Sequence, residues 1–146
     1  MMNDVAWQLE DSVEADASLS FVWSYLTDMK NWSDPPAEFA LDGPFAAGSQ
    51  GTTRMPGQEP VTWHIGDVQV GQSYTIEMEL PGATLSFRWS FDAVSDRRTR
   101  LTQRIVLAGS NAAAYVSEME QSFGANLQAG MEKIAATIAT AAARVG

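Results

Sequence analysis

The stretch YTIEMELPGATLSFRWSF, residues 74–91, decides the fold because it specifies one hairpin together with its register. Apolar and polar residues alternate on both sides of Pro81-Gly82, which is typical of two half-buried β-strands. Pro81-Gly82 suits the centre of a type II turn, since Pro fixes φ and Gly permits a positive φ. A two-residue loop then pairs Tyr74 with Trp89, and the apolar side chains of both strands share one face.

Further strands are predicted on both sides of this hairpin. Arg100–Leu107 alternates in the same way, with Gln103 among the apolar positions of one face. Val61–Ile65 also alternates, and the pattern then shifts by one residue, which a β-bulge at Gly66 explains. Trp7–Ala15 has the same alternation near the N-terminus. Regularly spaced Gly and Pro breaks separate these segments and favour antiparallel hairpins.

Two segments have helical periodicity instead. Leu19–Leu26 is predicted to be a short helix, and the hydroxyl of Ser18 suits its N-cap. After Gly109, apolar residues recur every three or four positions, which predicts one long amphipathic helix from about Asn111 to Arg144. The middle of its apolar stripe consists of Met119, Phe123, Leu127 and Met131.

The order of these elements predicts an α+β fold. A curved antiparallel sheet of about seven strands has one apolar face, which another element has to cover. The C-terminal helix is the only predicted element long enough to cover it, so the sheet is expected to wrap around this helix. Hydrophobic pockets form in clefts of this kind. At 146 residues the chain has the usual size of one domain, so residues 1–146 are expected to form a single domain.

Composition restricts the partners. The chain has 18 acidic and 9 basic residues and a net charge of −9, which argues against nucleic acid and anionic membrane surfaces. It has no Cys and one His, which excludes thiolate and multi-histidine metal centres, although carboxylate sites for hard cations remain open. We therefore expect no transition metal and no organic cofactor.

The sequence also lacks the patterns of targeting and membrane insertion. The N-terminal residues MMNDVAW contain neither a basic region nor an apolar stretch. No segment approaches the roughly 18 apolar residues of a membrane helix. We therefore expect a cytoplasmic protein without integral membrane association, and the sequence leaves open whether it forms a homodimer.

Several short motifs resemble one known family. The segment Ala15–Asp28 followed by Trp32 resembles the opening "A-x-x-x-x-V-W-x-x-L-x-D-x-x-x-W" of polyketide cyclase/dehydrase-like proteins. These proteins belong to the START-related, pollen-allergen-like helix-grip superfamily (SRPBCC). The resemblance extends from about Trp7 to Ala143. The other matching motifs are Gly48-Ser-Gln-Gly51, Thr62-Trp63-His-Ile65, Leu80-Pro-Gly-Ala83 and Thr99-Arg-Leu-Thr102.

The resemblance implies a helix-grip fold with an apolar cavity between the sheet and the C-terminal helix. Members of the superfamily bind lipids, polyketides, hormones or other hydrophobic molecules, and a minority catalyse cyclisation or dehydration. Because the matching motifs are mostly turns and core positions, they specify the fold and carry over no catalytic residue.

The candidate ligand-binding residues are large or flexible side chains on the predicted apolar faces. Each one alone is better explained as ordinary core, but together they resemble an adaptable hydrophobic pocket. Gln103 is the exception, because a buried amide needs a partner, either a ligand carbonyl or hydroxyl, a water, or Tyr74. The predicted set is Trp63, Tyr74, Met78, Phe87, Trp89, Gln103, Met119, Phe123 and Met131.

Two titratable residues are weaker candidates for acid–base chemistry. Asp11 falls on the inward parity of its strand, where a carboxylate can serve as general acid or base, but a bulge or a place at the pocket mouth would leave it solvated. His64 alternates against Trp63 and Ile65, which directs it toward solvent. Arg97, Arg98 and Arg100 are expected to form a solvated turn rather than an anion site, and Glu118, Glu120 and Glu132 the exposed face of the long helix.

Three functions are consistent with these observations. The first is binding of a small hydrophobic molecule, lipid- or polyketide-like, without metal or organic cofactor. The second is a cofactor-free polyketide cyclase or dehydratase, whose acid–base steps would fall to Asp11, His64, Tyr74 or Gln103. The third is a regulatory or co-chaperone-like interaction module with a vestigial cavity.

Overall fold

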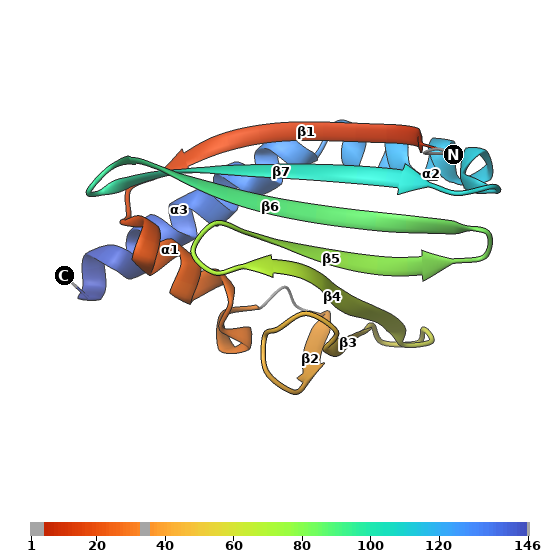
Figure 1. Cartoon of the computed structure of the whole chain (residues 1–146), viewed down its shortest axis with the longest axis horizontal. Coiled ribbons are helices and arrows are strands. Elements are labelled where there is room, and N and C mark those ends of the chain that lie inside the picture. The colour runs from red at the N-terminus through yellow and green to blue at the C-terminus, as the bar shows by residue number, and fades with distance from the viewer. Residues whose placement is uncertain (1–4, 33–35, 146) are drawn as a thin grey trace.

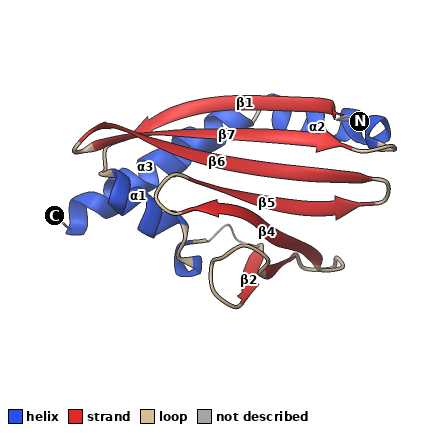
Figure 2. Ribbon diagram, viewed as in Figure 1, coloured by secondary structure: helices blue, strands red, loops and turns tan. Residues whose placement is uncertain are grey.

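The computed structural model describes residues 5–32 and 36–145 and has the predicted α+β architecture (Figure 1). Seven antiparallel strands form one curved sheet, and the helices lie against one face of it (Figure 2). The elements in chain order are β1 (Val5–Ala15), α1 (Leu19–Leu26), β2 (Glu38–Asp42), β3 (Gln50–Arg54), β4 (Val61–Gln69), β5 (Ser73–Leu80), β6 (Ala83–Ser95), β7 (Arg98–Ala108), α2 (Val116–Met119) and α3 (Leu127–Val145).

The strand order in the sheet is β1-β7-β6-β5-β4-β3-β2. Each strand from β2 to β7 therefore pairs with its neighbour in sequence, and β1 joins the sheet beside β7. Helix α3 runs diagonally behind β1, β7 and β6 in Figure 1, and α1 contacts α3 near the end that carries the C-terminus. This arrangement places helices over the β1 side of the sheet and confirms the predicted helix-grip fold.

The strand registers confirm the pairing predicted for the hairpin. Tyr74 lies opposite Trp89, and Leu80 opposite Ala83, on either side of the two-residue loop. Gly82 has a φ of +75°, a conformation that suits glycine because other residues carry a Cβ that clashes there. Between β4 and β5 the register shifts between Ile65 and Val68, so the bulge predicted at Gly66 is present.

Helix α1 has the predicted bounds, Leu19–Leu26, and the Ser18 hydroxyl accepts a hydrogen bond of 3.1 Å from the Phe21 amide. The prediction of one continuous C-terminal helix is wrong in its first half. A 3₁₀ turn, Ala112–Tyr115, precedes α2, and a π-helical turn, Glu120–Gly124, follows it. Only α3 is a long regular helix.

Two residues favour the break just before α3. Gly124 carries a conformational penalty in a helix of about 1 kcal/mol relative to alanine. Asn126, just before α3, donates its side-chain amide to the Ser122 carbonyl at 3.4 Å, and such local bonds compete with helical ones. The apolar periodicity continues through the interruption, and it therefore concealed the break in the backbone.

The core lies between the helices and the face of the sheet that we call the inner face. Its strand residues include Leu101, Ile105 and Leu107 of β7, which are fully buried. Met131 and Ile138 of α3 are buried against this face. The candidate site is therefore sought on the inner face.

Candidate functional site

One row of residues on the inner face differs in chemistry from its neighbours. Asp11 of β1 lies opposite Gln103 of β7, Gln103 opposite Trp89 of β6, and Trp89 opposite Tyr74 of β5. We call these four residues the polar row. The two adjacent rows are apolar and consist of Leu9, Ile105, Phe87 and Ile76 on one side and Val13, Leu101 and Phe91 on the other.

Three of the four residues in the polar row are buried. Tyr74, Trp89 and Gln103 are 2%, 8% and 9% exposed, and their side-chain polar atoms make no hydrogen bond with any residue that the structure describes. Within the same residues, no enclosed side-chain nitrogen or oxygen lacks a hydrogen-bond partner. A ligand or water can therefore act as the hydrogen-bond partner of the amide, the indole N–H and the phenol.

Tyr74 is held by aromatic side chains. Phe45 meets its ring edge-on at a centroid distance of 5.0 Å, and Trp23 does so at 6.1 Å. Burial raises the pKa of the Tyr74 phenol well above its ordinary value, because the phenolate would lose its hydration. The phenol is therefore protonated at neutral pH and can donate a hydrogen bond.

The predicted helix residues cover the inner face from the other side. Met119, Leu127 and Met131 are buried, and Phe123 of the π-helical turn meets Phe87 edge-on at 5.7 Å. The structure thus brings together the strand and helix members of the predicted set. Met78, Phe87 and Phe123 are only half-buried and pack against the core cluster.

Trp63 has a different environment from the rest of the predicted set. Its ring stacks on Trp32 at 5.6 Å, and its indole N–H donates to the Thr53 hydroxyl at 3.0 Å. The ring also fills the space beside Gly51, where an added Cβ would lie 2.2 Å from it. These contacts give Trp63 a packing role, and its contact with a ligand stays a prediction.

The two titratable candidates lie on opposite faces of the sheet. Asp11 is half-buried on the inner face, and the bulge of β1 lies between Val5 and Trp7, so it does not turn Asp11 outward. His64 lies on the outer face, as predicted, with its Nε2 2.9 Å from Glu77 Oε1. The alternation of β4 therefore separates His64 from the polar row.

Trp7 makes a long-range contact that the local sequence pattern does not predict. The indole N–H of Trp7 donates to Glu120 Oε1 at 2.8 Å and ties β1 to the π-helical turn. Glu120 was expected only as part of the exposed helix face. The inward parity of Trp7 was readable, but its partner lies 113 residues away in a turn that the helical pattern did not reveal.

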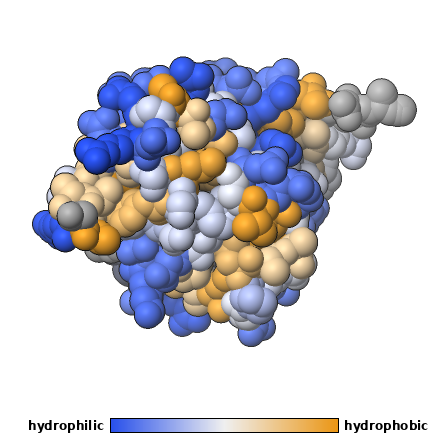
Figure 3. Space-filling view, turned by 60° about the vertical axis from the view of Figure 1, so that its left-hand side comes forward, coloured by the Kyte–Doolittle hydropathy of each residue, from blue (hydrophilic) through white to orange (hydrophobic). Residues whose placement is uncertain are grey.

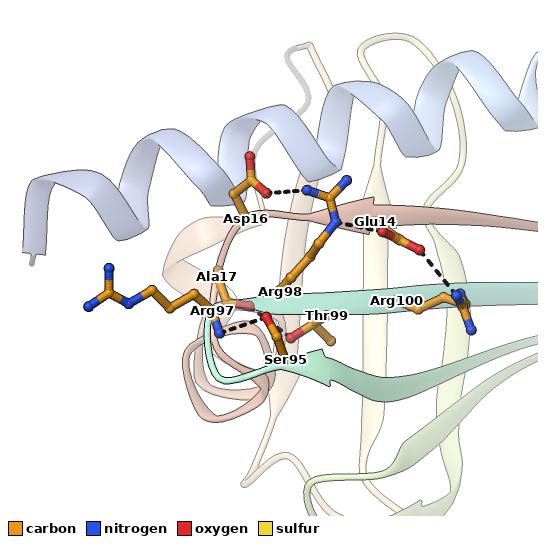
Figure 4. Close-up of polar contacts among 8 residues, drawn as sticks. All are labelled: Glu14, Asp16, Ala17, Ser95, Arg97, Arg98, Thr99 and Arg100. Atoms are coloured by element: carbon orange, nitrogen blue, oxygen red, sulfur yellow. Dashed lines mark hydrogen bonds and ion pairs between the residues drawn. The ribbon is translucent and has the colours of Figure 1, made fainter.

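The predicted basic cluster is an ion-pair network at one end of the sheet. Arg98 pairs with both Glu14 and Asp16, Arg100 pairs with Glu14, and Arg97 points away from them (Figure 4). Hydrogen bonds to Glu14 lower the pKa of its carboxyl below the ordinary value, the largest contribution coming from Arg98 and the next from Arg100. Arg98 and Arg100 are exposed, as expected, but they belong to β7 rather than to the turn, and their acidic partners largely neutralise them.

Two open grooves lie outside the polar row. The larger, of about 550 Å³, runs between β1, the start of β7 and α3, beside the ion pairs of Glu14 and Arg98. The smaller, of about 370 Å³, lies between Tyr25 and the C-terminal half of α3. Neither is lined by any of the nine predicted ligand-binding residues.

Two further findings concern ions and membranes. In residues 5–32 and 36–145, no group of three or more His, Cys, Asp or Glu side chains is placed to hold a metal ion. No helix in these ranges is both long and apolar enough to cross a membrane. The first four residues, part of the segment that shows no targeting pattern, lie outside the described residues.

Comparison with known families identifies the class of protein. Residues 6–139 match the family described as polyketide cyclase / dehydrase and lipid transport. The chain therefore belongs to this family, whose description covers ligand carriers as well as cyclases. A comparison with curated proteins finds no match.

Solved structures share the fold at low sequence identity. Norcoclaurine synthase from Thalictrum flavum, in complex with dopamine and hydroxybenzaldehyde, is 12% identical at a TM-score of 0.69 over 92% of this chain and 88% of that one. The Zhui aromatase/cyclase from Streptomyces sp. R1128 is 19% identical at 0.67, over 90% and 93%. Protein Ms6760 from Mycobacterium smegmatis is 16% identical at 0.61, over 91% and 88%.

Proposed function

We propose that the protein binds a small hydrophobic molecule, lipid- or polyketide-like, on the inner face of the sheet. The observation that carries this proposal is the side-chain amide of Gln103, which is 9% exposed and has no hydrogen-bond partner among the described residues. None of the described residues supplies a hydrogen-bond partner for this amide. A ligand with a hydroxyl or carbonyl group would supply that partner.

The surroundings of Gln103 support binding of a molecule with one polar and one apolar part. Trp89 and Tyr74 extend the row of hydrogen-bonding groups along the sheet. The apolar part would contact Phe87 and Phe123, with Met78, Met119 and Met131 as adaptable walls. A protein–ligand hydrogen bond of this kind contributes about 0.5–1.5 kcal/mol net, and apolar contact supplies the remainder of the affinity.

A second function, cyclisation or dehydration of a polyketide-like substrate, is favoured by the two ends of the polar row. Asp11 carries a carboxylate, and Tyr74 carries a phenol that burial keeps protonated. Neighbouring strands lie about 4.8 Å apart, so three spacings separate the backbones of these residues by roughly 14 Å. Only a substrate that spans the row would contact both groups, with Asp11 as base and Tyr74 as hydrogen-bond donor.

The first test looks for a ligand that the protein already carries. Native mass spectrometry of freshly purified protein is expected to show a second species, heavier by the mass of one small molecule. Extraction into organic solvent should remove that mass and return the molecule for identification.

The second test compares 2-naphthol with naphthalene, which has the same rings without the hydroxyl. The wild type is expected to bind 2-naphthol more tightly. Gln103→Leu should weaken 2-naphthol by about 1–3 kcal/mol, the cost of an unsatisfied buried group, and leave naphthalene unchanged or tighter. The control Gln50→Leu makes the same change at an exposed position of β3.

The outcomes separate the proposal from its alternatives. If neither compound binds the wild type and no ligand copurifies, the proposed function is wrong. If both bind and Gln103→Leu changes neither affinity, the ligand does not use the polar row. Turnover of a polyketide-like substrate that is lost in both Asp11→Asn and Tyr74→Phe would favour the cyclase.

A further inference from the structure

We infer that the site on the inner face takes ligands whose polar group is uncharged or cationic and excludes carboxylates. This inference rests on the proposed function and adds the charge of the ligand to it. It follows from where the chain places its positive and negative side chains relative to the polar row.

Every positive side chain of the chain lies away from the interior. All nine Lys and Arg residues are exposed. Strand alternation directs Arg88, Arg100 and Arg104 to the outer face, since their neighbours Trp89, Leu101 and Ile105 are buried on the inner one. Figure 3 shows hydrophilic residues interspersed with apolar ones on the face of the molecule that it displays.

The single histidine does not supply a cation to the site either. His64 belongs to β4 and alternates against the buried Trp63 and Ile65, which places it on the outer face. Its Nε2 already pairs with Glu77 at 2.9 Å. A carboxylate bound at the polar row would therefore have no basic side chain of the described residues as counter-ion.

The polar row contains a carboxyl group, that of Asp11, in addition to the protonated phenol of Tyr74. Asp11 lies directly opposite Gln103 on the neighbouring strand, and adjacent strands are about 4.8 Å apart. Asp11 is half-buried and forms no ion pair with any described residue. A ligand group that reaches the Gln103 amide therefore also comes close to the Asp11 carboxylate.

Elementary electrostatics then ranks three kinds of head group. A carboxylate would lose hydration, gain no counter-ion and meet a like charge. An alcohol loses little and can both accept from the Gln103 amide and donate to Asp11. An ammonium group would form a charge-assisted hydrogen bond with Asp11, the strongest of the three interactions.

The experiment uses three probes with the same twelve-carbon chain: dodecan-1-ol, dodecanoate and dodecylamine. Each is titrated below its solubility or micellar limit against protein loaded with the neutral dye Nile red, at pH 7.5 and low salt. Dodecan-1-ol and dodecylamine are expected to displace the dye. Dodecanoate is expected to bind at least tenfold more weakly than dodecan-1-ol.

Two variants show whether Asp11 causes the selection. Asp11→Asn is expected to weaken dodecylamine at least fivefold, to tighten dodecanoate, and to leave dodecan-1-ol within twofold. Glu10→Gln removes the same charge from the adjacent, exposed position of β1 and is expected to change no affinity by more than twofold. The wild-type comparison stands alone if Asp11→Asn does not fold.

Different results would overturn this inference and the proposed function. Displacement by dodecanoate as strong as that by dodecan-1-ol overturns this inference while the proposed function stands. Absence of displacement by all three probes overturns the proposed function itself. Equal effects of Asp11→Asn and Glu10→Gln assign the selection to the net charge of the protein and overturn the role of Asp11.

Discussion

Two buried polar residues of β7 differ in their hydrogen bonding, and this difference tests whether Gln103 serves a ligand. Thr99 is fully buried, and its hydroxyl donates to the Ala17 carbonyl at 2.8 Å (Figure 4). Gln103, four residues further along the same face, has no such partner among the described residues. Thr99→Val and Gln103→Leu each replace a polar side chain with an apolar one of similar size.

The expected magnitudes follow from this difference. Thr99→Val leaves the Ala17 carbonyl buried without its bond, which costs roughly 1–3 kcal/mol of unfolding free energy. Gln103→Leu breaks no protein–protein hydrogen bond and adds apolar area to the inner face. Its unfolding free energy is expected to stay within about 0.5 kcal/mol of the wild type or to rise, since such replacements are neutral or stabilising.

Urea denaturation followed by both tryptophan fluorescence and circular dichroism measures the two changes. Coincident transitions and an unchanged denaturant slope would show that both variants unfold in one step, as the comparison requires. If Gln103→Leu costs as much as Thr99→Val in protein freed of ligand, the amide is a structural hub. The polar row would then not be a ligand site.

Three further outcomes are expected from other parts of the fold. Gly51→Ala should lower the free energy of unfolding by roughly 1–3 kcal/mol, because the added Cβ would lie 2.2 Å from the Trp63 ring. Thermal denaturation would measure this loss. Gly130→Ala should instead raise the free energy of unfolding by up to about 1 kcal/mol, because the Cβ added in α3 would clash with no other atom. A loss of stability would contradict the helix assignment. Arg98→Ala should raise the pKa of Glu14 toward its ordinary value, as NMR titration of the carboxyl would report. Because the folded pKa of Glu14 is depressed, this pair stabilises the protein above the unfolded pKa of the carboxyl, and the benefit disappears as pH falls through the folded value. A stability difference between wild type and Arg98→Ala that grows toward low pH would contradict this assignment.

Much of the sheet was predictable because period-two patterning constrains register strongly. A shift of one residue would have moved Tyr74 and Trp89 to solvent, so their pairing followed from the alternation and the Pro81-Gly82 turn. The bulge at Gly66 followed from the same rule, since only an extra residue reconciles the two parities. The inward position of Gln103, and with it the centre of the polar row, came from this reasoning as well.

The remaining features depend on contacts between distant segments. Apolar periodicity survives a π-helical turn, so the break before α3 at Asn126 left no signal in the pattern. The stacking of Trp32 on Trp63 joins a loop to β4, and the Trp7–Glu120 bond joins β1 to the π-helical turn 113 residues away. No local pattern encodes which side chains meet in this way.

An NMR titration of ¹⁵N-labelled protein with 2-naphthol tests most directly whether the ligand binds at the polar row. If it does, the side-chain amide signals of Gln103 and the indole N–H signal of Trp89 shift together and saturate at one equivalent. The indole N–H of Trp63, which already donates to Thr53, should stay in place. Shifts confined to the groove around Glu14 and Arg98, with Gln103 and Trp89 unchanged, would contradict the account.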